Sequence, residues 1–487
     1  MRIHVLARPV ESTAALRRAH SFRNVVTDAI VPGCSVASNI DGTAGRCLCQ
    51  PHGAYDARRG GLGVIAIGLA ILVFLIFLGA PLFLAIGIPA IVLLVFDSTY
   101  APNVIATVFQ STLNNSVFIA IPLFVLTGKV MTASGAARRL TGFFESLLCH
   151  LPGGMAIVSI VSSVFFGAMT GSSIADTTAV GTIMIPAMVE TGYSRRFAAS
   201  VVAAGGCLGI LFPPGIPLIL FGAISQVSIA RLFQASLIPG VFVAAILITV
   251  AVVVAARGEG KRLPARSWGE RFSAFRKALP ALLLPLVVLG GIYLGLVTIT
   301  EAATLAAVYA ILIAATVYRE LSFSSFVRQL VDTAQVTSMI MFIVASSAVL
   351  AFYLIQSQAP QHLAAAVVGS KPSLTLFLLA TNAAFLILGF ILEPPAIIYL
   401  TVPLFVPLLA VVGVDPLHFA IIMILAMQIG LVHPPIGLNL FVVSGISKEP
   451  VETISLAVLP FLAALFVALI VVNVIPGLTL ALPGLMR

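Results

Sequence analysis

Long apolar runs follow one another from Gly61 almost to the C-terminus, separated by short polar or proline-containing breaks. A helix needs about 20 apolar residues to cross a bilayer, so this part of the chain has room for roughly a dozen crossings. Only 9% of the residues are charged, against about 25% in soluble domains. The ten-residue alternation of a transmembrane β-barrel is missing. The sequence predicts an all-α polytopic membrane protein, with the lipid bilayer as its solvent.

Apolar helices are expected in two groups. The first group lies near 62–79, 82–97, 116–133, 154–169, 197–211, 215–225 and 232–256. The second lies near 279–297, 301–318, 331–356, 374–392, 417–431, 436–446 and 453–475.

Positive charge gathers between these two groups. Residues 257–277 carry seven Lys or Arg side chains and two acidic ones. Lys and Arg collect in the cytoplasmic loops of membrane proteins. The net charge of +9 therefore reports topology, and no nucleic-acid partner is expected. The predicted parts are a tail (1–60), a first transmembrane repeat (61–256), a basic cytoplasmic loop (257–278), a second repeat (279–475) and a C-terminal tail (476–487).

Residues 1–60 differ from the rest, since they are polar and rich in arginine. They lack the apolar h-region of a secretory signal peptide. We expect a disordered cytoplasmic tail or a start codon assigned too far upstream, with a transit peptide as the alternative. Cys47 and Cys49 fall short of a metal-site pattern.

The two halves share a pattern of glycines and prolines. A Gly-x-x-x-Pro-Pro motif occurs in each, at Gly209–Pro214 and Gly430–Pro435. Aligning Gly167 with Gly389 brings the two motifs within one residue of register. Weak internal symmetry with helix breaks at matching places is the sequence sign of repeats in a secondary transporter.

Two segments interrupt the apolar helices. The first, Gly167–Pro186, is too polar for a lipid-exposed span and too apolar for a surface loop. Irregular backbone at membrane depth is tolerated only inside protein or beside a water-filled cavity. We therefore predict re-entrant hairpins at 170–190 and 393–410. Double prolines should unwind the backbone and free carbonyl groups for a cation, with a simple kink as the alternative. They stand at Pro213–Pro214, Pro394–Pro395 and Pro434–Pro435.

Polar side chains in these segments are the candidate functional groups. Carboxylates inside a membrane are costly and usually functional, which singles out Asp176 and Glu393. Glu301 and Asp332 are instead expected to stabilise helix starts. His433 is either a hydrogen-bonded histidine or a ligand. The hydroxyls suit a hard cation or a polar substrate, with close helix packing as the alternative; they belong to Thr170, Ser172, Ser173, Thr177 and Thr178.

Several enzyme signatures are missing. The sequence contains no GxxxxGK[ST] phosphate loop, no HExxH and no GxSxG, the motifs of ATP binding, metalloproteases and serine hydrolases. ATP-driven work on this chain and an intramembrane enzyme are both disfavoured.

Several long motifs, taken in order, resemble the large membrane subunit of tripartite ATP-independent periplasmic (TRAP) transporters. The resemblance covers about residues 62–475. Its motifs are AIPLFVLTGKVMTASG (Ala120–Gly135), the run Gly167–Gly222, TEAATLAAVYAIL (Thr300–Leu312), FILEPPAIIYLTVPLFVPLL and MQIGLVHPPIGLNLFVVSGIS.

The resemblance implies a bacterial inner-membrane permease of the inverted-repeat elevator type with two re-entrant hairpins. It implies Na⁺-coupled import of small organic acids, such as C4-dicarboxylates, sialic acids, keto acids or sugar acids. Two partners are implied, a small four-helix membrane subunit and a soluble periplasmic binding protein, which largely chooses the substrate.

Site residues follow from the same resemblance. The implied Na⁺ ligands are Thr170, Gly209, Phe212 and Pro214 in the first half, and Gly430, His433 and Pro435 in the second. The substrate carboxylate is expected at hairpin-tip hydroxyls and half-helix N-termini, with Ser172, Ser173, Asp176, Thr178, Glu393 and Pro394 as candidates. The alternatives are a self-sufficient Na⁺/anion symporter of similar architecture and a polytopic membrane enzyme.

Overall fold

The computed structural model describes residues 61–96, 101, 103–258, 260–362, 365 and 373–486. The predicted tail 1–60, with Cys47 and Cys49, lies outside the described residues. Residues 63–487 form one folded unit.

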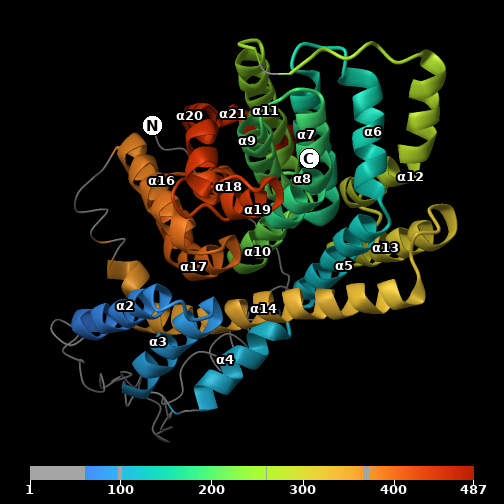
Figure 1. Ribbon diagram of the computed structural model, residues 1–487. Coiled ribbons are helices and arrows are strands. Elements are labelled where there is room, and N and C mark those ends of the chain that lie inside the picture. Colours follow the sequence, from blue (N-terminus) through green and yellow to red (C-terminus); the bar gives the residue numbers. More distant parts are fainter. Residues whose placement is uncertain are drawn as a thin grey trace, which may run out of the picture. The chain divides into compact units, whose positions relative to one another are not determined.

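The described residues form helices and no strand (Figure 1). Seven helical segments in this part of the chain are long and apolar enough to cross a membrane, so the predicted all-α polytopic fold is confirmed. The first group is α2 (Gly61–Phe77), α3 (Leu82–Phe96), α4 (Asn103–Leu113), η1 (Ser116–Ile119), α5 (Ala120–Ala133), α6 (Ala136–Leu148), α7 (Gly154–Thr170), α8 (Ser173–Glu190), α9 (Arg195–Gly206), η2 (Cys207–Ile210), α10 (Ile216–Ser225) and α11 (Ile229–Ala255). The second is α12 (Trp268–Tyr293), α13 (Ile299–Leu312), the π-helical turn η3 (Ile313–Val317), α14 (Phe323–Gln356), α16 (Leu374–Ile391), α17 (Pro394–Val412), α18 (Pro416–Val432), α19 (Leu438–Ser447), α20 (Val451–Val474) and α21 (Gly477–Leu485).

Some predicted boundaries are wrong. α8 is continuous from Ser173 to Glu190 and α17 from Pro394 to Val412, so each break is confined to a short turn before the helix. Pro394 and Pro395 open α17 rather than unwind a helix, because the first helical turn needs no backbone donor. α12 begins at Trp268, inside the predicted loop, and the predicted C-terminal tail contains α21.

The two helix starts expected at acidic residues have different outcomes. Glu301 forms a capping box with Thr298 at the start of α13, as predicted for a helix-start residue. Asp332 lies well inside α14, which begins at Phe323. The segment before Asp332 is helical but less apolar than a membrane span, which is why the hydrophobic pattern hid it.

The first predicted hairpin consists of α7 and α8, which pack against each other (Figure 1). Gly153, just before α7, lies against Val252 and Ala255 at the end of α11. The carbonyl of Thr191, just after α8, accepts a hydrogen bond from Lys261 N at 3.0 Å. Both open ends of this hairpin therefore lie beside the basic loop that follows α11. The hairpin is longer than predicted, since both of its arms are regular helices.

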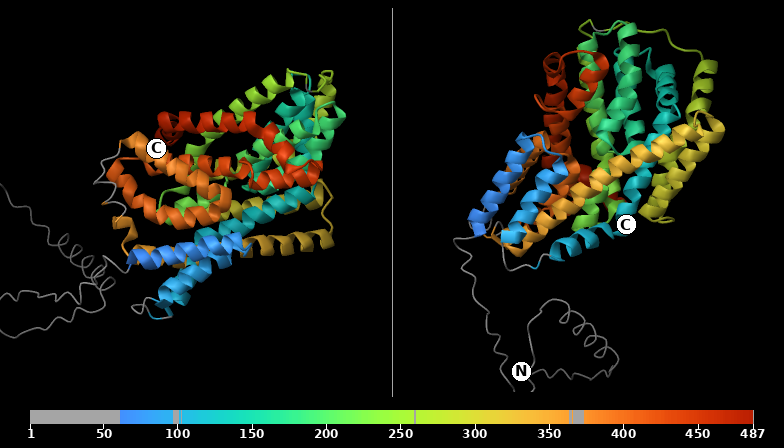
Figure 2. Two further views of the ribbon diagram at one scale, coloured as in Figure 1. Left: turned by 60° about the vertical axis from the view of Figure 1, so that its left-hand side comes forward. Right: turned by 60° about the horizontal axis from the view of Figure 1, so that its bottom comes forward.

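The two halves repeat the same order of helices: α7 to α11 correspond to α16 to α20. α10 and α19 each have 10 residues. Each is followed by a non-glycine residue in the left-handed region, Gln226 at φ 59° and Lys448 at φ 62°. Elsewhere, the long helix α14, gold in Figure 2, packs against α3, α4, α5 and α17.

Corresponding residues of the two halves meet at the centre of the unit. Cys207 Sγ donates to the carbonyl of Gln428 at 3.4 Å, and Gln428 Nε2 donates to the carbonyl of Cys207. Cys207 lies two residues before Gly209, and Gln428 lies two residues before Gly430, so the two residues occupy equivalent positions in the two halves. A reciprocal contact between equivalent positions is what a two-fold relation between the halves produces.

The basic segment after α11 yields a prediction of sidedness. We expect a cysteine at exposed Arg262 to resist a membrane-impermeant thiol reagent added to intact cells, because the positive charge of this segment predicts a cytoplasmic location. A cysteine at exposed Arg231, at the other end of α11, should be labelled. Cys149 and Cys207 are buried and can stay. The cysteines before residue 61 would be replaced by serine, so that only the introduced cysteine can react. If Arg262→Cys were labelled and Arg231→Cys were not, the predicted orientation in the membrane would be wrong.

Candidate functional site

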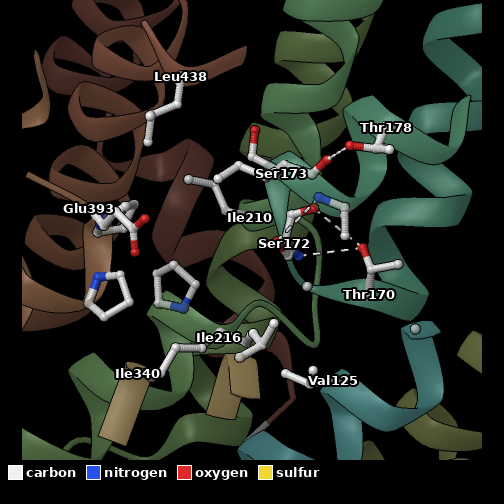
Figure 3. Close-up of a pocket in the computed structure, with 18 of the residues that line it drawn as sticks. Val125, Thr170, Ser172, Ser173, Thr178, Ile210, Ile216, Ile340, Glu393 and Leu438 are labelled. Atoms are coloured by element: carbon white, nitrogen blue, oxygen red, sulfur yellow. Dashed lines mark hydrogen bonds between the residues drawn. The ribbon is translucent and has the colours of Figure 1, made fainter. Parts of the chain in front are cut away.

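A cavity of about 400 Å³ lies between the tips of the two hairpins, within the usual range of about 300–1,000 Å³ for small-molecule sites. Figure 3 shows Glu393 on one side and Thr170, Ser172 and Ser173 on the other. Aliphatic side chains from other helices complete the wall, among them Val125, Ile210, Ile216, Ile340 and Leu438. The cavity is thus mostly apolar with a few polar groups at two facing edges.

The tip of the first hairpin is a two-residue turn. Gly171 adopts φ 60° and donates to the carbonyl of Gly167 at 2.8 Å, a left-handed helix end that glycine favours. Ser172 caps α8, its hydroxyl accepting from Ala175 N at 3.5 Å. The N-terminus of α8 therefore borders the cavity, and its free N–H groups attract negative charge.

The tip of the second hairpin is built differently. Glu393 is the N-cap of α17 but makes no capping hydrogen bond with its side chain, so its carboxylate is available to the cavity. Pro394 and Pro395 occupy the first turn and line the same wall. This tip brings a negative charge where the first brings hydroxyls.

In both halves the Gly-x-x-x-Pro-Pro motif packs against a hairpin through one glycine of the motif and one glycine of the hairpin. A Cβ atom on Gly167 would lie 2.4 Å from Gly209 Cα, and one on Gly430 would lie 2.5 Å from the carbonyl carbon of Gly389. Both contacts are backbone against backbone, which only glycine allows. The alignment matched Gly167 with Gly389 and the two motifs with each other, and in each half the hairpin glycine contacts the first glycine of the motif.

The predicted first cation site is partly assembled. A Cβ atom on Gly171 would lie 2.4 Å from the carbonyl oxygen of Pro214, so the hairpin tip rests on the break. Thr170 Oγ1 lies 3.5 Å from the carbonyl oxygen of Ser172, and Thr170 also lines the cavity. Phe212 is buried with its ring against Gly240 of α11.

Asp176 does not line the cavity, although it was a substrate candidate. Its side chain is 0% exposed, and neither carboxylate oxygen has a hydrogen-bond partner among the described residues. A Cβ atom on Gly209 would lie 3.2 Å from Asp176 Oδ2 and 3.3 Å from the carbonyl oxygen of Ser172. Carboxylate, carbonyl and nearby hydroxyl oxygens thus gather behind the tip. A hard cation prefers this donor set, so the residues present fit Na⁺.

The second half lacks an equivalent carboxylate. The position on α17 that corresponds to Asp176 is Ile397, fully buried. His433 stacks on Phe390 with ring centroids 4.3 Å apart, and its Nδ1 has no partner among the described residues. Pro435 is exposed. The two predicted cation sites therefore differ chemically.

The remaining candidates divide between the cavity and the helix interior. Thr178 lines the cavity, with its hydroxyl donated to the carbonyl of Ile174 at 2.7 Å. Thr177 is buried, and its hydroxyl has no hydrogen-bond partner among the described residues. Ser173 is buried and lines the cavity. Its hydroxyl donates to Asn439 Oδ1 of α19 at 3.1 Å and accepts from Asn439 Nδ2 at 2.8 Å.

Sequence reasoning missed three polar residues at this centre: Lys129, Gln428 and Asn439. Asn439 is fully buried and also donates to the carbonyl of Ala203 at 3.1 Å, which ties the second half to the first. Lys129 of α5 lines the cavity. Each interrupts an apolar helical run, and that signal alone marks a polar residue inside a membrane as a functional candidate.

Comparison with known proteins gives consistent matches. The family described as "Tripartite ATP-independent periplasmic transporter, DctM component" matches residues 69–478. The C4-dicarboxylate TRAP transporter large permease protein DctM of Pseudomonas aeruginosa is 40% identical over 81% of this chain and 92% of its own length. The sialic acid TRAP transporter large permease protein SiaM of Vibrio cholerae is 34% identical over 84% and 96%. Among solved structures, the YdaH transporter of Alcanivorax borkumensis matches with a TM-score of 0.56 at 13% identity, over 77% of this chain and 87% of that one, a likeness of fold alone.

Proposed function

The chain belongs to the DctM component family of tripartite ATP-independent periplasmic transporters, and on this premise we propose that it carries small organic acids across the bacterial inner membrane. The family consists of transporter permeases and not of enzymes. The observation that supports the substrate class is the cavity between the hairpin tips, bordered by the N-terminus of α8.

The cavity suits a small anion with an apolar part. The hydroxyl of Ser172 and the free N–H groups of α8 offer donors to a carboxylate. The aliphatic walls exclude water from the rest of the molecule, which strengthens those polar contacts. C4-dicarboxylates and sialic acids, for which two relatives are named, are the first substrates to test.

Coupling to Na⁺ is part of the proposal. Asp176, the carbonyl of Ser172 and the hydroxyl of Thr170 would hold one ion behind the first tip, together with backbone oxygens of the Gly209–Pro214 break. In this proposal Asp176, which the sequence suggested as a substrate-binding residue, is a Na⁺ ligand instead. The second site would use Gly430, His433 and Pro435 without a carboxylate. An inward Na⁺ gradient supplies work, since one charge crossing 100 mV is worth about 2.3 kcal/mol.

Two partner proteins are also part of the proposal. A small membrane subunit would contact the permease, and a soluble periplasmic protein would deliver the substrate. The tripartite description of the family supports this composition.

We expect uptake only when all three components are present together. Proteoliposomes would contain the purified chain alone, the chain with its small subunit, or both with the binding protein, and each would be offered labelled succinate, N-acetylneuraminate and isethionate under a Na⁺ gradient. The complete set should accumulate at least one acid, and omission of the binding protein should abolish uptake. Full uptake by the chain alone would identify a self-sufficient symporter, and no uptake of any acid by the complete set would refute the proposed function.

A further inference from the structure

Lys129 is the one lysine or arginine among the described residues that line the cavity. It belongs to α5, outside both hairpins. The other charged residue of the lining is Glu393 on the opposite tip. Without Lys129, an incoming organic anion would meet a carboxylate and only neutral donors.

The position of Lys129 is fixed by its neighbour on α5. A Cβ atom on Gly128 would lie 3.1 Å from Thr170 Cα, so α5 packs directly on the first hairpin at this point. Thr132, one turn later, also lines the cavity and donates its hydroxyl to the carbonyl of Gly128 at 2.7 Å. Lys129 is thereby held beside the tip that presents the serine hydroxyls.

Lys129 has no counter-charge within the described part of the chain. The ion pairs there are Arg139 with Glu320, and Arg266 with Glu145 and Glu270. Lys129 is nevertheless half-buried in an apolar helix, where an unpaired ammonium group is costly. A charge kept in such a place needs an anion for at least part of the transport cycle.

We propose that Lys129 binds the carboxylate, or equivalent anionic group, of the transported acid. This inference deepens the proposed function and rests on it. The hairpins supply neutral donors and the cation sites, and α5 supplies the positive charge that selects an anion. Loss of this charge should affect the anionic substrate more than Na⁺, whose proposed ligands lie behind the tip.

The test uses the complete three-component system and whichever of succinate, N-acetylneuraminate and isethionate the wild type takes up. We expect Lys129→Gln to lower the uptake rate about 10- to 150-fold, the loss typical of a hydrogen bond to a charged group. Lys129→Arg should keep most of the uptake because it keeps the charge. Lys261→Gln, which removes an exposed lysine outside the cavity, should behave as the wild type.

A binding measurement separates recognition from folding. In nanodiscs that hold the two membrane subunits, the sodium salt of the transported acid should raise the thermal unfolding midpoint above that in NaCl of equal Na⁺ concentration. Lys129→Gln should lose this difference but keep the stabilisation by NaCl. Uptake by Lys129→Gln within twofold of wild type would overturn the inference. The inference would also be overturned if Lys129→Arg lost as much uptake as Lys129→Gln and both variants lost the stabilisation by NaCl. Absence of wild-type uptake would instead refute the proposed function.

Discussion

Replacing Gly167 with alanine should abolish uptake, whereas the same change at the corresponding Gly389 should leave most of it. A Cβ atom on Gly167 would lie 2.4 Å from Gly209 Cα, but one on Gly389 would lie 3.4 Å from its nearest neighbours. At 2.4 Å the added methyl group of Gly167→Ala clashes with Gly209, so the hairpin must move away from the Gly209–Pro214 segment. At 3.4 Å the added methyl group of Gly389→Ala makes an ordinary van der Waals contact. Overpacking of this kind costs about 1–3 kcal/mol or more, and it also displaces the oxygens gathered around Asp176.

The measurement is uptake by the reconstituted complex, with protein amount and thermal unfolding determined for each variant. Gly430→Ala should resemble Gly167→Ala, since its added atom would lie 2.5 Å from the carbonyl carbon of Gly389. Gly142→Ala, with no neighbour within 4 Å, serves as the control. Equal uptake by Gly167→Ala and Gly389→Ala would show that uptake does not depend on the close contact between Gly167 and Gly209.

Replacing Asp176 with asparagine should shift the Na⁺ dependence of uptake to much higher concentration. The side chain keeps its size and loses the charge that is buried against Gly209. Removing a charged partner from a buried polar contact costs about 1.5–3 kcal/mol. The apparent Na⁺ affinity should therefore fall roughly 10- to 150-fold.

Two hydroxyl variants accompany this experiment. Thr170→Val should weaken the apparent Na⁺ affinity by about fivefold or more, because it removes one neutral oxygen near the Ser172 carbonyl. Thr178→Val should leave the Na⁺ activation curve unchanged, since its hydroxyl is bonded within its own helix. If Asp176→Asn has the wild-type Na⁺ curve at equal protein levels, the first cation site lies elsewhere.

Local sequence patterns were reliable where one physical constraint dominated. Bilayer thickness sets the length of an apolar helix, so spans such as α11 and α20 were predicted within a few residues. Capping chemistry is equally local, and Glu301 was assigned correctly for that reason. α4, α6 and α21 were missed because they are short, and α6 carries charged residues on one face.

One of the three double prolines was over-interpreted as a helix break, because Pro394 and Pro395 open α17. The interruptions expected at 170–190 and 393–410 also contain prolines that lie inside continuous helices, Pro186 in α8 and Pro403 and Pro407 in α17. In a membrane helix, neighbouring helices and local adjustments can satisfy the carbonyl that proline leaves without a donor. Only tertiary packing decides between a kinked helix and an interrupted one, and sequence cannot supply it.

By itself, the sequence determined that this protein is helical, membrane-embedded and internally repeated, because hydrophobic length and glycine–proline spacing record those properties directly. It also identified the two hairpin tips. Only the tertiary structure decided which side each polar group faces: Asp176 turns away from the cavity toward Gly209, and Lys129 reaches the cavity from α5. The physical reason is that a site inside a helical bundle is assembled from helices distant in sequence, and the rotation of each helix is set by close packing against its neighbours.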